Sequence, residues 1–443
     1  MLRLTFVVIV FAIGVVAALR SRFAALVFYV WYALFRPQEW VWTDIDAYRL
    51  STILGALLVI PCLMTGVWPV IGHPIAIGAV SFLATCLISQ HGALNPEVGW
   101  YWIEFMAKLI LISLIAVRLT STPQRLVTLV AAIVASFGFH SAEAGLGSLL
   151  GGGLRFFTGT GGAFVDSNAY AVGCVMIVPL LIAVSHIASA RWVRWLAAIG
   201  VPLTIVTIVS TYSRGGLLAL IAALLTLALL SRYRWRIVAA AIVVVPVLLL
   251  FVRLPTGYTE RMSTIQTYEE VGDDSALGRL HFWRVALHMA ADRPLGVGLW
   301  NFESTYDQYD SSGGEYGTHR AVHNSHLQVL TETGWLGALC WAALFVTAFS
   351  LAIRARHRAA LMDPDHARLT IAMANGLIAS MAGFLVGGTF VSMAYNDLTW
   401  LTFALVASLD RLSCEFVAQQ EPARTEAEFA SPFDPVASDA TVG

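Results

Sequence analysis

The sequence predicts an all-α protein that crosses a membrane many times, and two observations support that fold class. Hydrophobic residues make up 58% of the chain and charged residues 12%, whereas charged residues make up about 25% of a soluble domain. The apolar runs are about 17–25 residues long, the length at which a helix crosses about 30 Å of hydrocarbon. Runs of this length exclude a transmembrane barrel, the other fold that satisfies every backbone amide within a bilayer. We therefore expect a polytopic helical bundle.

The apolar runs follow one another along almost the whole chain. Depending on how the first two are counted, they predict about twelve transmembrane helices and make residues 1–412 one transmembrane domain. The remaining residues, 413–443, are polar, acidic and proline-containing, so they are expected to form a disordered cytoplasmic tail. The runs lie at 3–19, 23–36, 51–68, 70–89, 100–118, 125–141, 168–189, 194–211, 215–231, 236–252, 326–353, 369–392 and 395–411.

Arginines in the short connections predict the orientation, because short basic connections mark the cytoplasmic side. They place the long segment 253–325 outside, together with 37–50, 90–99 and 142–167. One conflict stays open: if residues 3–19 cross fully, the N-terminus is outside, whereas a half-crossing first run, or a miscounted pair elsewhere, restores an internal N-terminus. The arginines are Arg20, Arg22, Arg118, Arg125, Arg191, Arg194 and those of 232–236 and 354–358.

The external segment 253–325 is too long to be a simple connector, since structureless loops beyond about 12–15 residues are uncommon in compact folds. Within it we expect an amphipathic helix at the outer membrane surface, ended by a proline and two glycines. A polar, flexible run, "STYDQYDSSGGEYGTHRAVHNSH", follows it. The expected apolar stripe consists of Leu280, Trp283, Leu287 and Ala290, and the helix ends at Pro294, Gly296 and Gly298.

Three charged or titratable residues are expected at this outer face. Arg214 lies at the outer end of a helix pair, Arg279 at the start of the surface helix, and His323 just before the run at 326. Two arginines and a histidine suit a phosphate-bearing lipid, because arginine stays protonated and matches phosphate oxygens bidentately. Each also has a structural explanation: Arg214 can extend to the interface, Arg279 can pair with a nearby aspartate, and His323 can help to cap the next helix.

Metal binding is an alternative to phosphate-lipid binding at this face, because His319, His323 and His326 have the close spacing of zinc ligands. No cysteine joins them, and the five cysteines are scattered without metal-type spacing. We therefore predict no metal ligand.

The stretch "HNSHLQVLTETGWLG" (323–337) has His323, Asn324, Gly334 and Gly337 at the fixed positions of a pattern typical of the O-antigen ligase family, which it resembles. Supporting matches are "SRGG" at 213–216, "GRLHFW" at 278–283, "DRPLGVGLWNF" at 292–302 and "GTGGAFVDSNAYA" at 159–171. The N-terminal "FRPQEWVWTDIDAYRLS" (35–51) is similar to the start of O-glycosylation ligases associated with exosortase systems.

The resemblance implies a GT-C-like, metal-independent glycosyltransferase without a cofactor, in the inner membrane of a bacterium with its active site facing the periplasm. It would transfer a glycan from undecaprenyl pyrophosphate to an acceptor hydroxyl, on lipid A core in lipopolysaccharide biosynthesis or on a secreted protein in O-glycosylation. His323 would be the catalytic base, and Arg214 and Arg279 would bind the pyrophosphate. The implied partners are the lipid-linked glycan, the acceptor and the bilayer, with no nucleic acid.

Other residues are expected in supporting positions. Asn324 can orient the base, Trp283 can stack on a sugar, and Asp166 and Asn168 either bind the acceptor or shape their loop. Arg284 stays open as an alternative to Arg279. Gly334 and Gly337 are expected to let neighbouring helices approach closely, and the loop 303–322 to close over the donor.

Two other functions remain open. A polymerase of O-antigen or exopolysaccharide shares the fold and the donor but uses a second lipid-linked glycan as acceptor. A transporter or flippase of the lipid-linked glycan predicts charged residues near the midplane and an internal repeat, and the sequence shows no convincing repeat.

Overall fold

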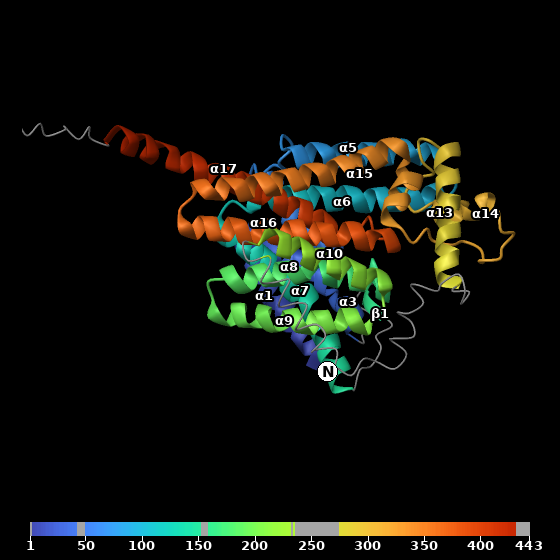
Figure 1. Ribbon diagram of the computed structural model, residues 1–443, viewed down its shortest axis with the longest axis horizontal. Coiled ribbons are helices and arrows are strands. Elements are labelled where there is room, and N and C mark those ends of the chain that lie inside the picture. Colours follow the sequence, from blue (N-terminus) through green and yellow to red (C-terminus); the bar gives the residue numbers. More distant parts are fainter. Residues whose placement is uncertain (1, 42–48, 152–157, 232–233, 235–273, 431–443) are drawn as a thin grey trace, which may run out of the picture.

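A computed structural model describes residues 2–41, 49–151, 158–231, 234 and 274–430 of the chain (Figure 1). The described part is a helical bundle with one small hairpin, β1 (Thr158–Gly161) and β2 (Phe164–Asp166), whose strands are antiparallel. Its helices are α1 (Leu2–Arg20), α2 (Arg22–Phe35), α3 (Pro37–Trp40), α4 (Leu50–Met64), α5 (Pro74–Ser89), α6 (Pro96–Leu119), α7 (Pro123–Leu150), α8 (Ser167–Ile187), α9 (Arg191–Ser210), α10 (Arg214–Leu230), α13 (Asp274–Asp292), α14 (Phe302–Tyr309), α15 (Ser325–Arg358), α16 (Pro364–Gly387) and α17 (Asp397–Ala430), with 3₁₀ turns η2 (Gln90–Gly92), η3 (Ala359–Leu361) and η4 (Gly388–Phe390).

The all-α, membrane-spanning class is confirmed. Among the described residues, seven helical stretches are long and apolar enough to cross a membrane, and three shorter apolar helices, α2, α4 and α10, accompany them. The predicted run at 236–252 lies outside the described residues. The seven stretches are Arg3–Arg20, Pro74–Gly92, Pro123–Leu150, Ser167–Ile187, Arg191–Ser210, Ser325–Leu361 and Pro364–Phe390.

Four helices begin with the same local signal, a capping side chain followed by proline. The caps of α5, α6, α7 and α16 each accept a hydrogen bond from a backbone N–H of the first turn. Proline suits the next position, since its fixed φ is helical and its missing N–H would be unpaired there. The pairs are His73–Pro74, Asn95–Pro96, Thr122–Pro123 and Asp363–Pro364.

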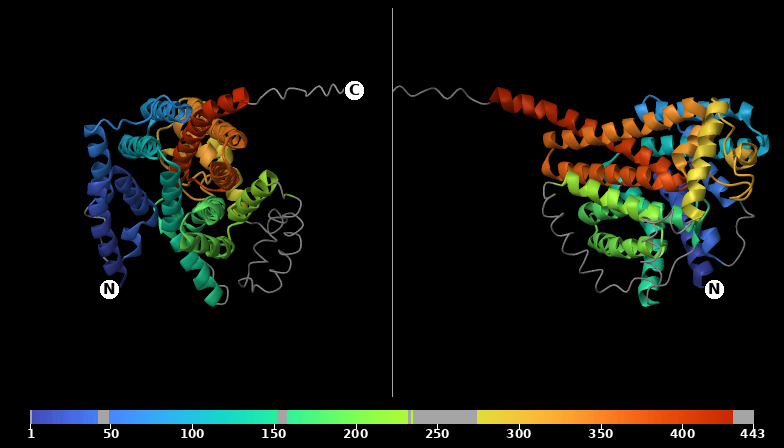
Figure 2. Two further views of the ribbon diagram at one scale, coloured as in Figure 1. Left: turned by 90° about the vertical axis from the view of Figure 1, so that its left-hand side faces the viewer. Right: turned by 45° about the vertical axis from the view of Figure 1, so that its right-hand side comes forward.

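The centre of the bundle is α8, which packs against α7, α9, α10 and α16. Of its spanning stretch 78% is buried, against 11% for α1. Seen along the bundle, several helices appear nearly end-on, whereas the dark blue N-terminal helices run lengthwise down one flank (Figure 2, left). The position of α1 explains its exposure, because a helix on the flank has only a few protein neighbours and leaves its remaining apolar surface for lipid.

The surface helix predicted within 253–325 is present as α13, and it lies across the ends of α15 and its neighbours (Figure 1). We call this end of the bundle the α13 end. Of the predicted stripe, Leu280 and Leu287 are exposed, whereas Ala290 is buried. The protein-facing side instead contains Phe282, Val285, Ala286 and Met289, which pack with Phe302, Tyr306 and Val322. Apolar residues occupy both faces of α13, so periodicity alone did not distinguish the face that packs on the protein.

Within α15 the helix breaks at Gly334, which has φ 70° and ψ −175°. A continuous helix would direct the N–H of Trp335 at the carbonyl of Thr331. Here the turn after α13 inserts instead and satisfies the groups freed by the break, as buried backbone requires. Trp335 N–H donates to Pro294 O at 3.0 Å, Val297 N–H to Thr331 O at 2.9 Å, and Gly298 N–H to Glu332 O at 3.1 Å.

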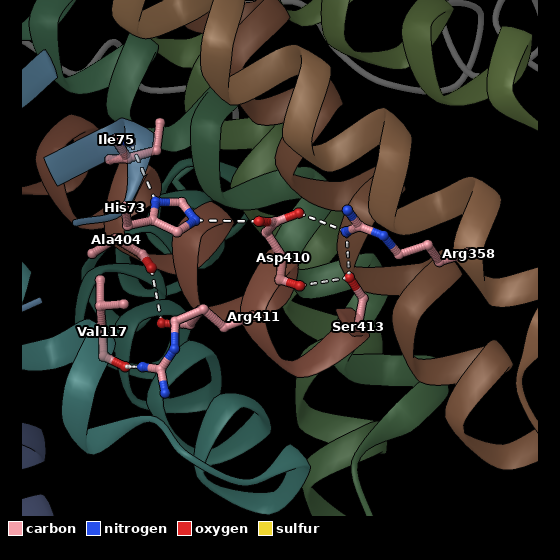
Figure 3. Close-up of polar contacts among 9 residues, drawn as sticks. His73, Ile75, Val117, Arg358, Ala404, Asp410, Arg411 and Ser413 are labelled. Atoms are coloured by element: carbon pink, nitrogen blue, oxygen red, sulfur yellow. Dashed lines mark hydrogen bonds and ion pairs between the residues drawn. The ribbon is translucent and has the colours of Figure 1, made fainter. Parts of the chain in front are cut away.

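The opposite end of the bundle is held by a polar cluster around Asp410 of α17 (Figure 3). Its carboxylate accepts from Arg358 Nη1 at 2.6 Å and lies 3.2 Å from His73 Nε2. The neighbouring Arg411 donates to the carbonyl of Val117 at 2.8 Å. These bonds join the beginning of α5 and the ends of α6 and α15 to the middle of α17, so part of the arginine-rich end has a structural explanation.

The C-terminal segment differs from the predicted disordered tail, because α17 continues as a helix to Ala430. Phe416 is 8% exposed and anchors this extension on the bundle, and the alanine, glutamate, glutamine and arginine residues that follow favour helix. The rest of the predicted tail, 431–443, lies outside the described residues.

Replacing Gly334 by alanine is expected to lower the free energy of unfolding by at least about 2 kcal/mol. The φ and ψ of Gly334 are open almost only to glycine, and a Cβ there would lie 2.3 Å from the carbonyl oxygen of Pro294. Gly147→Ala is the control, since a Cβ at this α7 position meets nothing within 4 Å and alanine favours helix by up to about 1 kcal/mol. Thermal unfolding of the full chain in detergent measures both; equal midpoints would contradict the prediction.

Candidate functional site

A cavity of about 180 Å³ opens at the α13 end, and we call it the His323 cavity. Four separate segments wall it: the hairpin and the start of α8, the turn before α14, the residues around the start of α15, and the connection between η4 and α17. Its lining is Gly162, Ala163, Val165, Asp166, Ala169, Trp300, Phe302, Glu303, Ala321, Val322, His323, Gln328, Glu332, Val391 and Ser392.

His323 occupies the position just before the N-cap of α15 and has a left-handed backbone, with φ 48°. This conformation is uncommon for a residue other than glycine and is found disproportionately at functional sites. Its ring is half-buried and lies 6.0 Å, between centroids, from Phe282 of α13. The packing of α13 across the bundle therefore covers one side of the imidazole, while another side faces the cavity.

The charges around His323 come from three segments. Burial lowers the pKa of the imidazole from its ordinary value, the positive charges of Arg279 and Arg320 lower it further, and the Asp166 carboxylate opposes them. The structure thus brings Arg279 and Asp166, both predicted site residues, within electrostatic range of His323. At neutral pH a histidine with a lowered pKa is uncharged and able to accept a proton.

Arg214 begins α10, where the Ser213 hydroxyl caps the helix by accepting from Gly216 N–H at 3.0 Å. A Cβ on Gly215 would lie 2.7 Å from Phe390, the last residue of η4, and one on Gly388, the first, would lie 3.4 Å from Ser325. The 3₁₀ turn η4 therefore lies between the start of α10 and the start of α15, and Arg214 is in the same part of the α13 end as His323.

The supporting residues have more structural roles than expected. Asn324 is the N-cap of α15, and its side-chain oxygen accepts from the N–H groups of His326 and Leu327. Trp283 packs against the small core between α13 and α14 and is absent from the lining of the His323 cavity. Asn168 donates its amide to Asp166 at 3.3 Å; Asp166 itself caps α8 and lines the cavity.

The other two histidines of the zinc-like spacing are engaged elsewhere. Trp341 Nε1–H donates to His326 Nδ1 at 3.2 Å, so the other ring nitrogen, Nε2, carries the proton and donates to Leu385 O at 3.0 Å. His319 lies 3.5 Å from the carboxylate of Asp307 on the surface. Among the residues that the structure describes, no three histidine, cysteine or acidic side chains are grouped as metal ligands.

Glu332 is a further candidate site residue, one that the sequence motifs did not single out. It is 2% exposed, lines the His323 cavity, and its Oε2 has no hydrogen-bond partner among the described residues. Tyr395 and Gln328 flank the same carboxyl group. The sequence does contain a signal for it: Glu332 lies in the apolar run 326–353, and an ionisable residue in an apolar span is a functional candidate by default.

The segment after α13 is more ordered than its polar composition suggested. Residues 302–309 form α14, and Asp310 then accepts hydrogen bonds from the backbone and hydroxyl of Ser312, from Gly314 N–H and from the His281 ring. Burial opposes ionisation of this carboxyl, but the four bonds outweigh it and hold its pKa at about 2. The predicted flexible run is therefore partly wrong, because Asp310 joins it to α13.

Two family matches divide the chain. Residues 199–342 match the family described as O-antigen ligase, and residues 1–189 match a family of unknown function, DUF5935. No curated protein matches the chain. The His323 cavity has walls from both matched segments: 162–169 belong to the segment 1–189, and 300–332 to the segment 199–342.

The pKa of His323 is expected to lie below the ordinary value and to move in opposite directions in two variants. Arg279→Gln removes a positive charge and should raise it, whereas Asp166→Asn removes the opposing carboxylate, keeps a good helix cap, and should lower it. Titration of histidine ring resonances by NMR in detergent measures the shifts. Arg284→Gln, an exposed arginine farther along α13, is the control, and a shift there equal to that of Arg279→Gln would contradict the assignment.

Proposed function

We propose, from the match of residues 199–342 to the O-antigen ligase family, that the chain transfers a glycan from a polyprenyl pyrophosphate, of the undecaprenyl type, to an acceptor hydroxyl at the periplasmic face of the inner membrane. His323 is the general base of this proposal, and Arg279 and Arg214 bind the pyrophosphate. The acceptor hydroxyl belongs to lipid A core or, following the similarity at residues 35–51 to exosortase-associated ligases, to a secreted protein.

One observation carries the proposal: an imidazole with a lowered pKa lies at a cavity beside a guanidinium, in the segment that matches the ligase family. A neutral imidazole accepts the proton of a hydroxyl, which is a poor nucleophile at neutral pH. This help is worth about 10²–10⁴ in rate. The nearby Arg279 serves two purposes, since it keeps the imidazole neutral and supplies charge for phosphate oxygens.

The proposed step has a simple balance of bonds. The acceptor oxygen attacks the anomeric carbon as His323 takes its proton, a new glycosidic bond forms, and the bond from that carbon to the phosphate oxygen breaks. The bond's electron pair leaves with the pyrophosphate, where preorganised arginines stabilise the developing charge. Direct attack from the opposite face inverts the anomeric configuration.

The main prediction is that His323→Ala abolishes transfer from a synthetic polyprenyl-pyrophosphate oligosaccharide, lowering the rate by at least about 10²-fold. His319→Ala is the matched control, because His319 lies on the same segment but 69% of its side chain is exposed and it pairs with Asp307. Full-length variants in membranes are compared with and without EDTA, and the products are separated by size.

Each outcome of this assay decides something. Transfer by an inserted His323→Ala protein would overturn the base assignment, and loss of wild-type activity in EDTA would overturn the metal-independent mechanism. A ladder of growing chains without a separate acceptor would assign the chain to the polymerases. Movement of the lipid-linked glycan across the bilayer without transfer would make it a transporter.

Glu332→Gln tests whether the buried carboxylate takes part. The variant keeps the side-chain volume and replaces a buried carboxyl group by an uncharged amide, so its unfolding midpoint should equal or exceed that of the wild type. If the unpartnered oxygen contacts substrate, kcat/KM should fall at least about tenfold. Unchanged transfer together with higher stability would show that Glu332 has no part in the reaction.

A further inference from the structure

A second cavity, of about 310 Å³, lies on the other side of the hairpin from the His323 cavity, and we call it the Arg36 cavity. Its walls come from the end of α2, from α3, from the second half of α7, and from β1 and the start of α8. All of these residues fall within 1–189, so the segment that matches the O-antigen ligase family contributes none of the lining. Its volume is at the lower end of the range of about 300–1,000 Å³ typical of small-molecule sites.

Aromatic rings form one side of the Arg36 cavity. Trp40 stands edge-on to Phe35, with ring centroids 5.3 Å apart and planes at 79°. Tyr170, which is fully buried, also lines the cavity. Trp40 is also held in place by Arg3, whose guanidinium lies 5.0 Å from the ring centroid. Fixed rings of this kind offer flat apolar surface at little entropic cost.

Hydrogen-bond donors and carboxylate acceptors form the other side of the Arg36 cavity. Arg36 Nη2 donates to Glu39 at 3.1 Å, and His140 Nδ1 lies 3.9 Å from Glu143. Each of the two carboxylate side chains is 48% exposed, so both remain accessible to a ligand. Arg36 is already paired with Glu39, and Glu143 adds a second carboxylate to the lining. This balance disfavours an anion and suits a neutral molecule with many hydroxyls.

Buried polar atoms in the same lining lack partners. Arg36 Nε, Trp40 Nε1 and Thr160 Oγ1 have no hydrogen-bond partner among the described residues. Unpaired buried donors are uncommon in native proteins and call for an explanation. Arg36 also has a left-handed backbone, with φ 51°, another feature that is enriched at binding sites.

The two cavities share the hairpin as a wall. Gly162 lines the His323 cavity, yet a Cβ on it would lie 2.6 Å from Arg36 Nη1, and one on Gly161 would lie 2.6 Å from the Glu39 side chain. The hairpin turn therefore rests directly on the Arg36–Glu39 pair. A molecule with several sugar rings could occupy both cavities only by passing this turn.

We propose that the Arg36 cavity is a saccharide-binding subsite, which holds a sugar ring of one of the two substrates while the reacting end lies in the His323 cavity. The aromatic side packs on the apolar face of the ring, and Glu39, Glu143 and Arg36 bind its hydroxyls. The ring belongs either to the acceptor or to the distal part of the donor glycan. This proposal rests on the proposed glycan transfer.

The test uses Glu39→Gln and Glu143→Gln, which keep side-chain volume, and Trp40→Leu. Glu97→Gln, exposed in the first turn of α6, is the control for the glutamates, and Trp68→Leu, 64% exposed, is the control for the tryptophan. In the transfer assay the cavity variants should raise the KM for one substrate about tenfold, with kcat within about twofold. The substrate whose KM rises identifies the source of the ring.

A binding measurement separates this proposal from the proposed function. Saturation-transfer NMR of the full-length protein uses two probes: the free oligosaccharide of the donor and a free core oligosaccharide. The wild type should bind one probe, and the cavity variants should bind it at least about tenfold more weakly. Binding that depends on the cavity, without any transfer, would contradict the proposed glycan transfer but support the saccharide subsite. Normal binding and normal KM values in folded glutamate variants would overturn the subsite.

Discussion

The break of α15 at Gly334 is the constraint on which the α13 end depends. A helix that stops hydrogen-bonding to itself inside an apolar bundle leaves backbone groups that must find partners, and here the turn 294–298 supplies them. The same insertion fixes the end of α13, the backbone of Glu332 and the approach to α14. Gly334 in α15 and the proline-glycine turn about forty residues earlier therefore act together: one breaks the helix, and the other supplies the hydrogen-bond partners.

Much of this architecture could be predicted from the sequence where the signal is local. Span lengths, caps followed by proline, and the end of α13 near Pro294 all follow from short-range chemistry. The close approach of Arg279, Asp166 and His323 was expected only as residues sharing one face, because no local pattern measures a distance between segments. The side of α13 that packs on the protein was not predicted, since the helix is apolar on two faces. Gly334 was expected to permit helix packing rather than a break, which needs the backbone angles to be known. The helix through 413–430 was missed because a charged composition was read as disorder although its residues favour helix.

Charge is used differently at the two ends of the bundle. Around Asp410 the carboxylate, His73 and Arg358 satisfy one another and join three helices, α5, α15 and α17. At the α13 end, Glu332 has one oxygen without a hydrogen-bond partner among the described residues, and His323 lies near charged side chains of both signs. Left-handed residues other than glycine gather there as well, at Trp300 and His323 beside one cavity and at Arg36 beside the other. Strain and incomplete pairing cost stability, and their concentration at one end is typical of a site that acts on another molecule.

The hairpin turn, a single layer of backbone between the two cavities, can couple the affinities of ligands bound on its two sides. Gly161 and Gly162 are packed on Arg36 and Glu39 without room for a Cβ, so the turn cannot shift toward one cavity without changing the space in the other. If a molecule that displaces the turn on one side changes the affinity on the other, linkage requires the effect to be equal in both directions. Two substrates bound on opposite sides of this turn would then change each other's affinity before any bond forms between them.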